Sequence, residues 1–136
     1  MPEMQVNYLA VLVTGVVLFM LGGLWYSPLL FAKKWLTMVE KSEEDLRKAS
    51  SPVNYLLVFL AEVVTAFVLA LVIGWAGVTA PAGGALVGFL LWAGLAGGTT
   101  FMTYTFSARA RGLWAIDTGY TLVAFVVGGV ILSLWR

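Results

Sequence analysis

The chain of 136 residues contains neither cysteine nor histidine, and these two absences remove much of ordinary protein chemistry. Without cysteine there are no disulfides, no thiol nucleophile and no cysteine to carry a lipid or a haem. Without histidine a Ser-His-Asp triad is excluded, and zinc loses the two side chains that usually bind it. The sequence therefore predicts a protein that is not an enzyme, with no metal site and no cofactor.

Charge is scarce as well. Only 11% of the residues are charged and 61% are hydrophobic, whereas a soluble domain carries about 25% charge. No charged residue occurs between Met4 and Ala32, or between Val63 and Ala108. A net charge of +1 provides no basic surface for nucleic acid. The composition predicts an integral membrane protein whose surroundings are the lipid bilayer, with no nucleic-acid partner.

Proline and glycine divide the apolar sequence into four segments. Ser27-Pro28 ends the first segment, and Ser51-Pro52 suits the cap and first turn of the second. The sequence GVTAPAGG interrupts the long uncharged stretch and is typical of a turn. Apolar runs of about 20 residues cross a bilayer as helices, because lipid cannot satisfy an open backbone. The sequence predicts one all-α membrane domain, residues 1–136, a bundle of four transmembrane helices at residues 6–26, 53–76, 84–106 and 113–135.

The loop of residues 27–52 is the only sizeable hydrophilic element. Its first half mixes large apolar side chains with Lys33 and Lys34, a pattern typical of a segment in the lipid headgroup region. Its second half begins with Ser42, a suitable helix cap, followed by acids and then by Arg47 and Lys48. We expect a short amphipathic helix on the cytoplasmic side, acting as a linker.

The basic residues predict the orientation of the bundle. Seven lie in the two loops on one side, and one, Arg136, lies on the other side. Loops rich in lysine and arginine stay in the cytoplasm. The sequence therefore predicts a protein of the plasma (inner) membrane with both basic loops cytoplasmic and both termini outside. The seven residues are Lys33, Lys34, Lys41, Arg47, Lys48, Arg109 and Arg111.

Glu62 lies about ten residues into the second segment, roughly 15 Å along the helix and so near the bilayer centre. No predicted span carries a basic residue inside its apolar part that could neutralise this acid. Glu62 is therefore protonated and hydrogen-bonded, with Thr65 one turn away as a candidate partner, or solvated in a cavity, or paired with a transient cation. The leading hypothesis is a transporter that moves a proton or a small cationic solute through Glu62. The alternative is a structural or accessory membrane protein in which Glu62 is a neutral acid.

Asp117 is a second acid, about one and a half turns into the fourth segment. Tyr120 shares its helical face. Arg109 or Arg111 could extend toward it, so we expect mainly a structural anchor for the nearby loop. If the two helix faces meet, Asp117 and Glu62 would form a stepped pair that relays a proton or a cation.

Trp92 falls near the middle of the third segment, at a depth comparable with that of Glu62. A tryptophan at this depth usually packs between helices with its indole N–H hydrogen-bonded, and Glu62 is a candidate acceptor. The other hypothesis is an aromatic wall for a small organic cation.

Glycines recur at spacings that let helices approach closely. Four thin helices offer little interior of their own, so we expect a homo-oligomer. The glycines predicted to pack helices are Gly15, Gly22, Gly84, Gly88, Gly94, Gly98 and Gly119.

Five motifs follow one another along the chain: NYLAVLV at 7–13, GGLWYSPLLFAKKW at 22–35, SEEDL at 42–46, GFLLWAGL at 88–95 and RGLWAIDTGYTLV at 111–123. Together they resemble the membrane family catalogued as domain of unknown function 1761, over nearly the whole chain. The resemblance implies a four-span membrane protein and carries no agreed activity.

A shorter similarity concerns LAEVVTA at 60–66. It is similar to the stretch around the membrane-embedded glutamate of small multidrug resistance transporters, which exchange protons for drug cations. That glutamate lies in their first helix, whereas Glu62 lies in the second segment here. The similarity suggests a mechanism to test and assigns no family.

Overall fold

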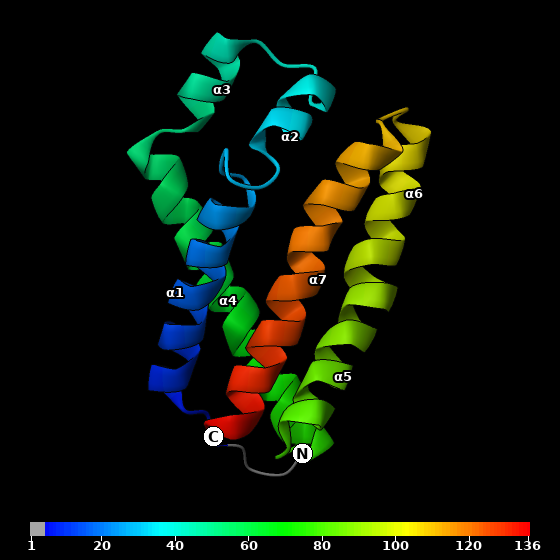
Figure 1. Cartoon of the computed structure of the whole chain (residues 1–136). Coiled ribbons are helices and arrows are strands. Elements are labelled where there is room, and N and C mark those ends of the chain that lie inside the picture. Colours follow the sequence, from blue (N-terminus) through cyan, green and yellow to red (C-terminus); the bar gives the residue numbers. More distant parts are fainter. Residues whose placement is uncertain (1–4) are drawn as a thin grey trace.

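The computed structural model describes residues 5–136, and every regular element in this range is a helix (Figure 1). Four helical segments are long and apolar enough to cross a membrane. This confirms the predicted all-α, four-span architecture. The segments are α1 (Tyr8–Trp25), α4 (Pro52–Ala76), the consecutive α5 (Pro81–Leu91), η1 (Trp92–Gly97) and α6 (Gly98–Phe106), and α7 (Arg111–Leu134).

Local sequence explains where the long helices begin and end. The side chain of Asn7 accepts a hydrogen bond from the Ala10 amide at 3.0 Å and caps α1. Ser51 caps α4 in the same way, ahead of proline in the first turn. α4 ends at Gly77, whose φ of 69° is the left-handed conformation that glycine adopts readily.

The third span contains a π-helix, η1, which the sequence analysis did not predict. A π-turn breaks the regular hydrogen-bond ladder of an α-helix. A side chain of α7 takes part in the bonding around it: the indole Nε1 of Trp114 donates to the carbonyl oxygen of Gly97 at 3.3 Å and to Thr100 Oγ1 at 3.2 Å. The irregular turn is therefore supported by a side chain from the neighbouring helix.

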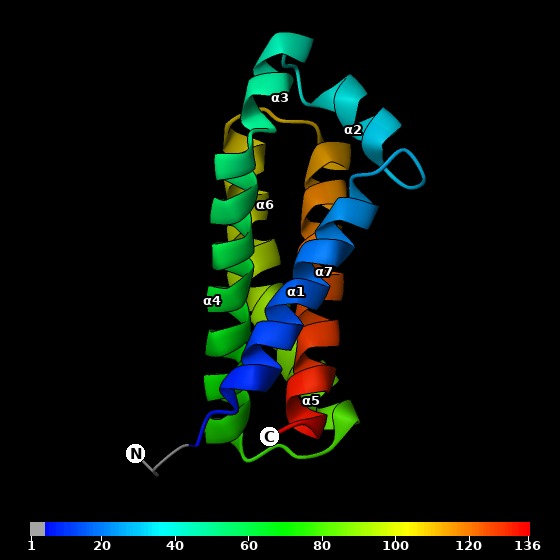
Figure 2. The same ribbon diagram turned by 90° about the vertical axis from the view of Figure 1, so that its left-hand side faces the viewer.

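α7 is the central helix of the bundle. Its most extensive contact is with α5, and it also packs against α1 and α4, whereas α4 and α5 barely touch. Figure 2 shows α1 passing from beside α4 at one end of the molecule to beside α7 at the other. An apolar groove with a volume of about 360 Å³ lies where α4 and the third span diverge, and Thr65 and Leu95 are among its lining residues.

The half of the bundle that contains the start of α1 and the end of α7 is closely packed. A Cβ added at Gly84 would overlap the carbonyl oxygen of Gly129, and one added at Gly88 would overlap that of Phe125. The backbones of α5 and α7 therefore lie in direct contact, as small residues allow. The buried core beside this contact comprises Ala10, Val11, Ala66, Leu69, Ile73 and Leu132.

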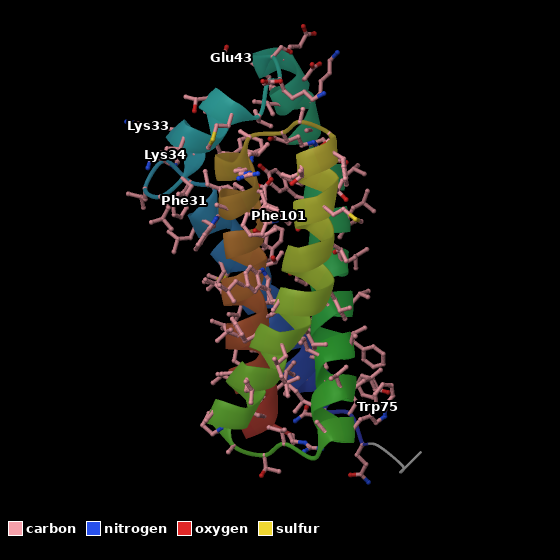
Figure 3. The ribbon with its side chains drawn as sticks, turned by 90° about the vertical axis from the view of Figure 1, so that its right-hand side faces the viewer. Phe31, Lys33, Lys34, Glu43, Trp75 and Phe101 are labelled. Atoms are coloured by element: carbon pink, nitrogen blue, oxygen red, sulfur yellow. The ribbon has the colours of Figure 1, made fainter. Side chains whose placement is uncertain are left out.

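Two short helices, α2 (Ala32–Met38) and α3 (Glu43–Ala49), occupy the loop between the first two spans. Ser42 caps α3 by accepting a hydrogen bond from the Asp45 amide at 3.1 Å. Lys33, Lys34 and Glu43 lie at the outer surface of this end (Figure 3). We call the end with α2, α3 and residues 107–110 the basic end, and the end with residues 5–7, 77–80 and 135–136 the terminal end.

Candidate functional site

Three side chains from three different elements converge on the carboxylate of Asp117. Its Oδ1 accepts hydrogen bonds from the Tyr26 hydroxyl at 2.7 Å and from Trp35 Nε1 at 3.1 Å. Its Oδ2 accepts one from the Tyr104 hydroxyl at 2.7 Å. These donors come from the end of α1, from α2 and from α6, so residues distant in sequence meet at one acid. We call Tyr26, Trp35, Tyr104 and Asp117 the Asp117 cluster.

Two further indoles hold the backbone on both sides of Asp117. Trp25 Nε1 donates to the carbonyl oxygen of Ile116 at 2.8 Å, and Trp92 Nε1 donates to that of Thr118 at 2.7 Å. A Cβ added at Gly119 would stand 3.0 Å from the ring of Trp25, so this glycine lets the indole lie close to α7. The position of the carboxylate is therefore fixed from the backbone as well as from its own hydrogen bonds.

Within the described part of the chain, the carboxylate of Asp117 has no ion-pair partner. Within residues 5–136 the ion pair is Lys48 with Glu44 on the surface of α3, at 3.4 Å. The guanidinium of Arg109 lies 4.9 Å from the ring centre of Tyr104, and that of Arg111 lies 5.8 Å from the ring centre of Phe101. The expected anchoring of Asp117 by one of these arginines is not formed, because both arginines lie on aromatic rings. Neutral donors stabilise a carboxylate without cancelling its charge.

Two cavities reach Asp117 from the basic end, and Trp35 lines both. One has a volume of about 370 Å³ and lies between α2, the residues after it and the 107–110 turn. We call it the α2–α6 cavity. The other has a volume of about 450 Å³ and lies between α2, α3 and the start of α4. We call it the α3–α4 cavity. Both volumes are in the range of small-molecule sites, about 300–1,000 Å³.

Glu62 has different surroundings. Its Oε1 lies 2.6 Å from the hydroxyl oxygen of Tyr120, and that hydroxyl also lies 2.7 Å from the backbone carbonyl oxygen of Leu18. Tyr120 has one proton to donate, and a carbonyl oxygen can only accept. Both contacts are hydrogen bonds only if Tyr120 donates to Leu18 and accepts from a protonated Glu62. A Cβ at Gly22 would stand 3.4 Å from the ring of Tyr120, which locates this triad between α1, α4 and α7.

Thr65 and Trp92 form no hydrogen bond with Glu62, contrary to the pairings considered from the sequence. The Thr65 hydroxyl donates to the Ala61 carbonyl oxygen of its own helix at 3.0 Å. The Trp92 indole is committed to Thr118. Trp92 thus packs the third span against α7, and the partner of Glu62 is Tyr120.

Asp117 and Glu62 are held by different hydrogen-bond partners. Tyr26, bonded to Asp117, and Tyr120, bonded to Glu62, have ring centres 6.1 Å apart. The two acids therefore belong to adjoining clusters connected by an aromatic contact.

The predicted packing glycines divide into two groups. Gly15 lies against Val63, where an added Cβ would stand 2.7 Å from a methyl carbon, and Gly22, Gly84, Gly88 and Gly119 lie at contacts already described. Gly94 has nothing within 4 Å of such a Cβ, and Gly98 meets only the Ala93 carbonyl oxygen of its own span.

Sequence reasoning missed Tyr26, Trp35 and Tyr104 as partners of Asp117. Tyr26 and Tyr104 lie near the ends of predicted spans, where aromatic residues are common at the membrane interface, a general preference that reveals no specific contact. The available signal was the pair of motifs WYSPLLFAKKW and AIDTGY, which contain Tyr26, Trp35 and Asp117. Within residues 5–136, no group of three or more acidic side chains comes together that could hold a metal ion.

Comparison with known proteins identifies the family. No curated protein and no solved structure matches the chain. A family model described as "Protein of unknown function (DUF1761)" matches residues 9–133, a range that includes the whole Asp117 cluster and Glu62. The chain is therefore a member of the DUF1761 family of membrane proteins.

Proposed function

We propose that this protein binds a small cationic solute at Asp117 and carries it across the membrane. The observation that supports this proposal is the carboxylate of Asp117, held by three neutral donors and reached by two cavities. An acid in a membrane protein that lacks a basic partner attracts cations strongly, because little solvent screens it. In this proposal Asp117, rather than Glu62, is the carboxylate that meets the solute.

The side chains around Asp117 suit an organic cation. Tyr26, Trp35 and Tyr104 surround the carboxylate with aromatic rings, and the rings of Tyr26 and Trp35 are 5.9 Å apart in an edge-to-face arrangement. Aromatic faces attract ammonium groups, and a carboxylate adds direct charge attraction. A bare metal ion would gain less here, because Asp117 is the single acid of the Asp117 cluster.

Glu62 has a second role in this proposal. Its hydrogen bond with Tyr120, together with the bond from Tyr120 to Leu18, holds α1, α4 and α7 together on the terminal-end side of the Asp117 cluster. Beyond this triad the terminal end is closely packed. A transport cycle therefore requires a second state in which the triad separates. We propose that the basic end faces the cytoplasm, so this conformation is open to the inside.

The experiment compares Asp117→Asn with Glu62→Gln in purified protein reconstituted into liposomes. The amide introduced by Asp117→Asn still accepts hydrogen bonds but carries no charge, so this variant separates the effect of charge from that of folding. We expect uptake of radiolabelled ethanolamine by the parent protein, loss of uptake in Asp117→Asn, and retention of ethanolamine binding in Glu62→Gln. Equal uptake by the parent and Asp117→Asn, or no binding to the parent, would overturn the proposal.

A specific observation favours a second candidate function, that of an accessory membrane protein. α2 and the residues before it expose Leu29, Leu30 and Leu36 beside the exposed Lys33 and Lys34. Such a surface suits an anionic membrane or a partner protein. In that case Asp117 only fastens α2 to the bundle, and the parent protein binds no ethanolamine.

A further inference from the structure

The α2–α6 cavity is lined by charges of both signs at separate positions. Asp117 lies at its inner end, within the Asp117 cluster. Lys41 and Arg109 line the cavity from exposed positions at the basic end, together with Glu40. The lining carries two positive and two negative charges and therefore no net charge. A lining of this kind favours a ligand that also carries both charges over a bare cation or a bare anion.

Backbone conformation connects the two basic residues to this cavity. Within residues 5–136, two residues other than glycine have a positive φ: Glu40 at 56° and Ala108 at 58°. Each directly precedes one of the two basic residues, Lys41 and Arg109. Each is the residue directly after the C-cap of a helix, Val39 of α2 and Ser107 of α6, where a left-handed conformation commonly ends a helix. Both helix ends line the same cavity.

Arg109 is exposed, yet its backbone and its side chain both contact Tyr104. Its backbone amide donates to the carbonyl oxygen of Tyr104 at 2.9 Å, and its guanidinium lies over the ring of the same tyrosine. The hydroxyl of Tyr104 in turn donates to Asp117. One side chain, Tyr104, thus separates the guanidinium from the carboxylate and keeps both along one wall of the cavity.

We infer that the α2–α6 cavity binds a zwitterion, with its ammonium group against Asp117, Trp35 and Tyr104 and its phosphate or carboxylate group against Lys41 and Arg109. This inference rests on the proposed function and names its substrate class. The cavity volume of about 370 Å³ accommodates a ligand of this size. The same chemistry occurs in a free amino phosphate or amino acid and in the headgroup of an ethanolamine lipid.

Three probes that differ by one group test the inference on the purified full chain by titration calorimetry. O-phosphoethanolamine carries both charges, ethanolamine only the ammonium group, and ethyl phosphate only the anion. We expect O-phosphoethanolamine to bind at least about tenfold more tightly than ethanolamine, since a charge-assisted hydrogen bond contributes that much. Arg109→Gln and Lys41→Gln should each reduce this advantage, and Arg111→Gln, which alters an arginine on Phe101, should preserve it.

The outcomes distinguish the inference from the proposed function. Equal binding of ethanolamine and O-phosphoethanolamine, with Asp117→Asn abolishing both, overturns the zwitterion and leaves the cation site standing. Absence of binding by all three probes overturns both. Because Arg109→Gln and Lys41→Gln change separate positions, misfolding of one variant still leaves the other to test the inference. The thermal unfolding midpoint of each variant shows whether it is folded.

The two sources of the ligand are separated in nanodiscs. If the lipid headgroup is the ligand, replacing phosphatidylcholine with phosphatidylethanolamine should weaken O-phosphoethanolamine binding by competition. Unchanged binding identifies the free solute as the ligand. Either result supports the inference, provided that Arg109→Gln weakens O-phosphoethanolamine binding toward that of ethanolamine; binding that Arg109→Gln leaves unweakened in both lipids overturns it.

Discussion

The hydroxyl of Tyr120 has one proton for two contacts, with Glu62 and with Leu18. Both contacts are hydrogen bonds if a protonated Glu62 donates to Tyr120 and Tyr120 donates to Leu18. Glu62→Gln keeps a neutral side chain that can still donate, so the thermal unfolding midpoint in detergent should change little. Tyr120→Phe removes both hydrogen bonds and should destabilise the fold by about 1–2 kcal/mol, a typical sum for interhelical bonds in membranes.

The comparison of these two variants is the control for Glu62. If Glu62 were ionised in the folded protein, glutamine would replace a charged acceptor, and Glu62→Gln would alter stability as strongly as Tyr120→Phe. Equal and large losses in both variants would therefore contradict a neutral Glu62.

The two acids were predictable from the sequence, whereas their partners were not. Glu62 and Asp117 stand out because charged residues are rare in apolar helices. The hydrogen bonds of Asp117 come from residues 26, 35 and 104, and the direction of an indole N–H depends on how three separate elements pack. The same holds for Trp92. The sequence predicts its depth in the span, but its hydrogen bond to Thr118 depends on how α7 is rotated about its own axis.

At the scale of elements, the contact between α5 and α7 depends on glycine. Gly84→Ala places a methyl group onto the carbonyl oxygen of Gly129 and forces the helices apart. We expect a loss of about 1–3 kcal/mol, the usual cost of overpacking. Gly94→Ala is the matched control in the same span, because nothing lies within 4 Å of its added Cβ. Thermal unfolding followed by circular dichroism compares the two, and equal midpoints would contradict the close α5–α7 contact.

The attachment of α2 gives a second prediction about an element. Trp35→Phe keeps an aromatic ring beside Tyr26 but removes the N–H that reaches Asp117. A hydrogen bond to a charged group contributes about 1.5–3 kcal/mol, so backbone amides of residues 32–38 should exchange with deuterium at least about tenfold faster. Trp75→Phe, at an exposed position in α4, is the control and should leave this exchange unchanged. Unaltered exchange in Trp35→Phe would mean that other contacts hold α2.

The positions of the four spans were predictable from the sequence, because hydropathy and clusters of serine, glycine and proline determine them. The helix α5 begins at Pro81, three residues before the predicted span, since proline suits a first turn. The π-helix η1 was not predictable, because its support comes from Trp114 on another helix.

The surroundings of the glycines weaken the sequence-based argument that the protein is a homo-oligomer. Gly84, Gly88 and Gly15 lie at contacts inside one protomer, so their spacing needs no second copy to explain it. Gly94 is the predicted packing glycine that remains without a neighbour. The homo-oligomer therefore stays a prediction. Its remaining support from glycine spacing is the face of the third span that carries Gly94.

Orientation is the prediction that the absence of cysteine makes simple to test. Single reporters can be introduced as Lys41→Cys at the basic end and Thr79→Cys in the loop at the terminal end, with no native thiol to label. The excess of basic residues at the basic end predicts that this end stays in the cytoplasm. A membrane-impermeant maleimide should then label Thr79→Cys in intact cells and Lys41→Cys only after permeabilisation. Labelling of Lys41→Cys in intact cells would reverse the orientation and place the opening to Asp117 outside, so the solute would be captured from the outer side.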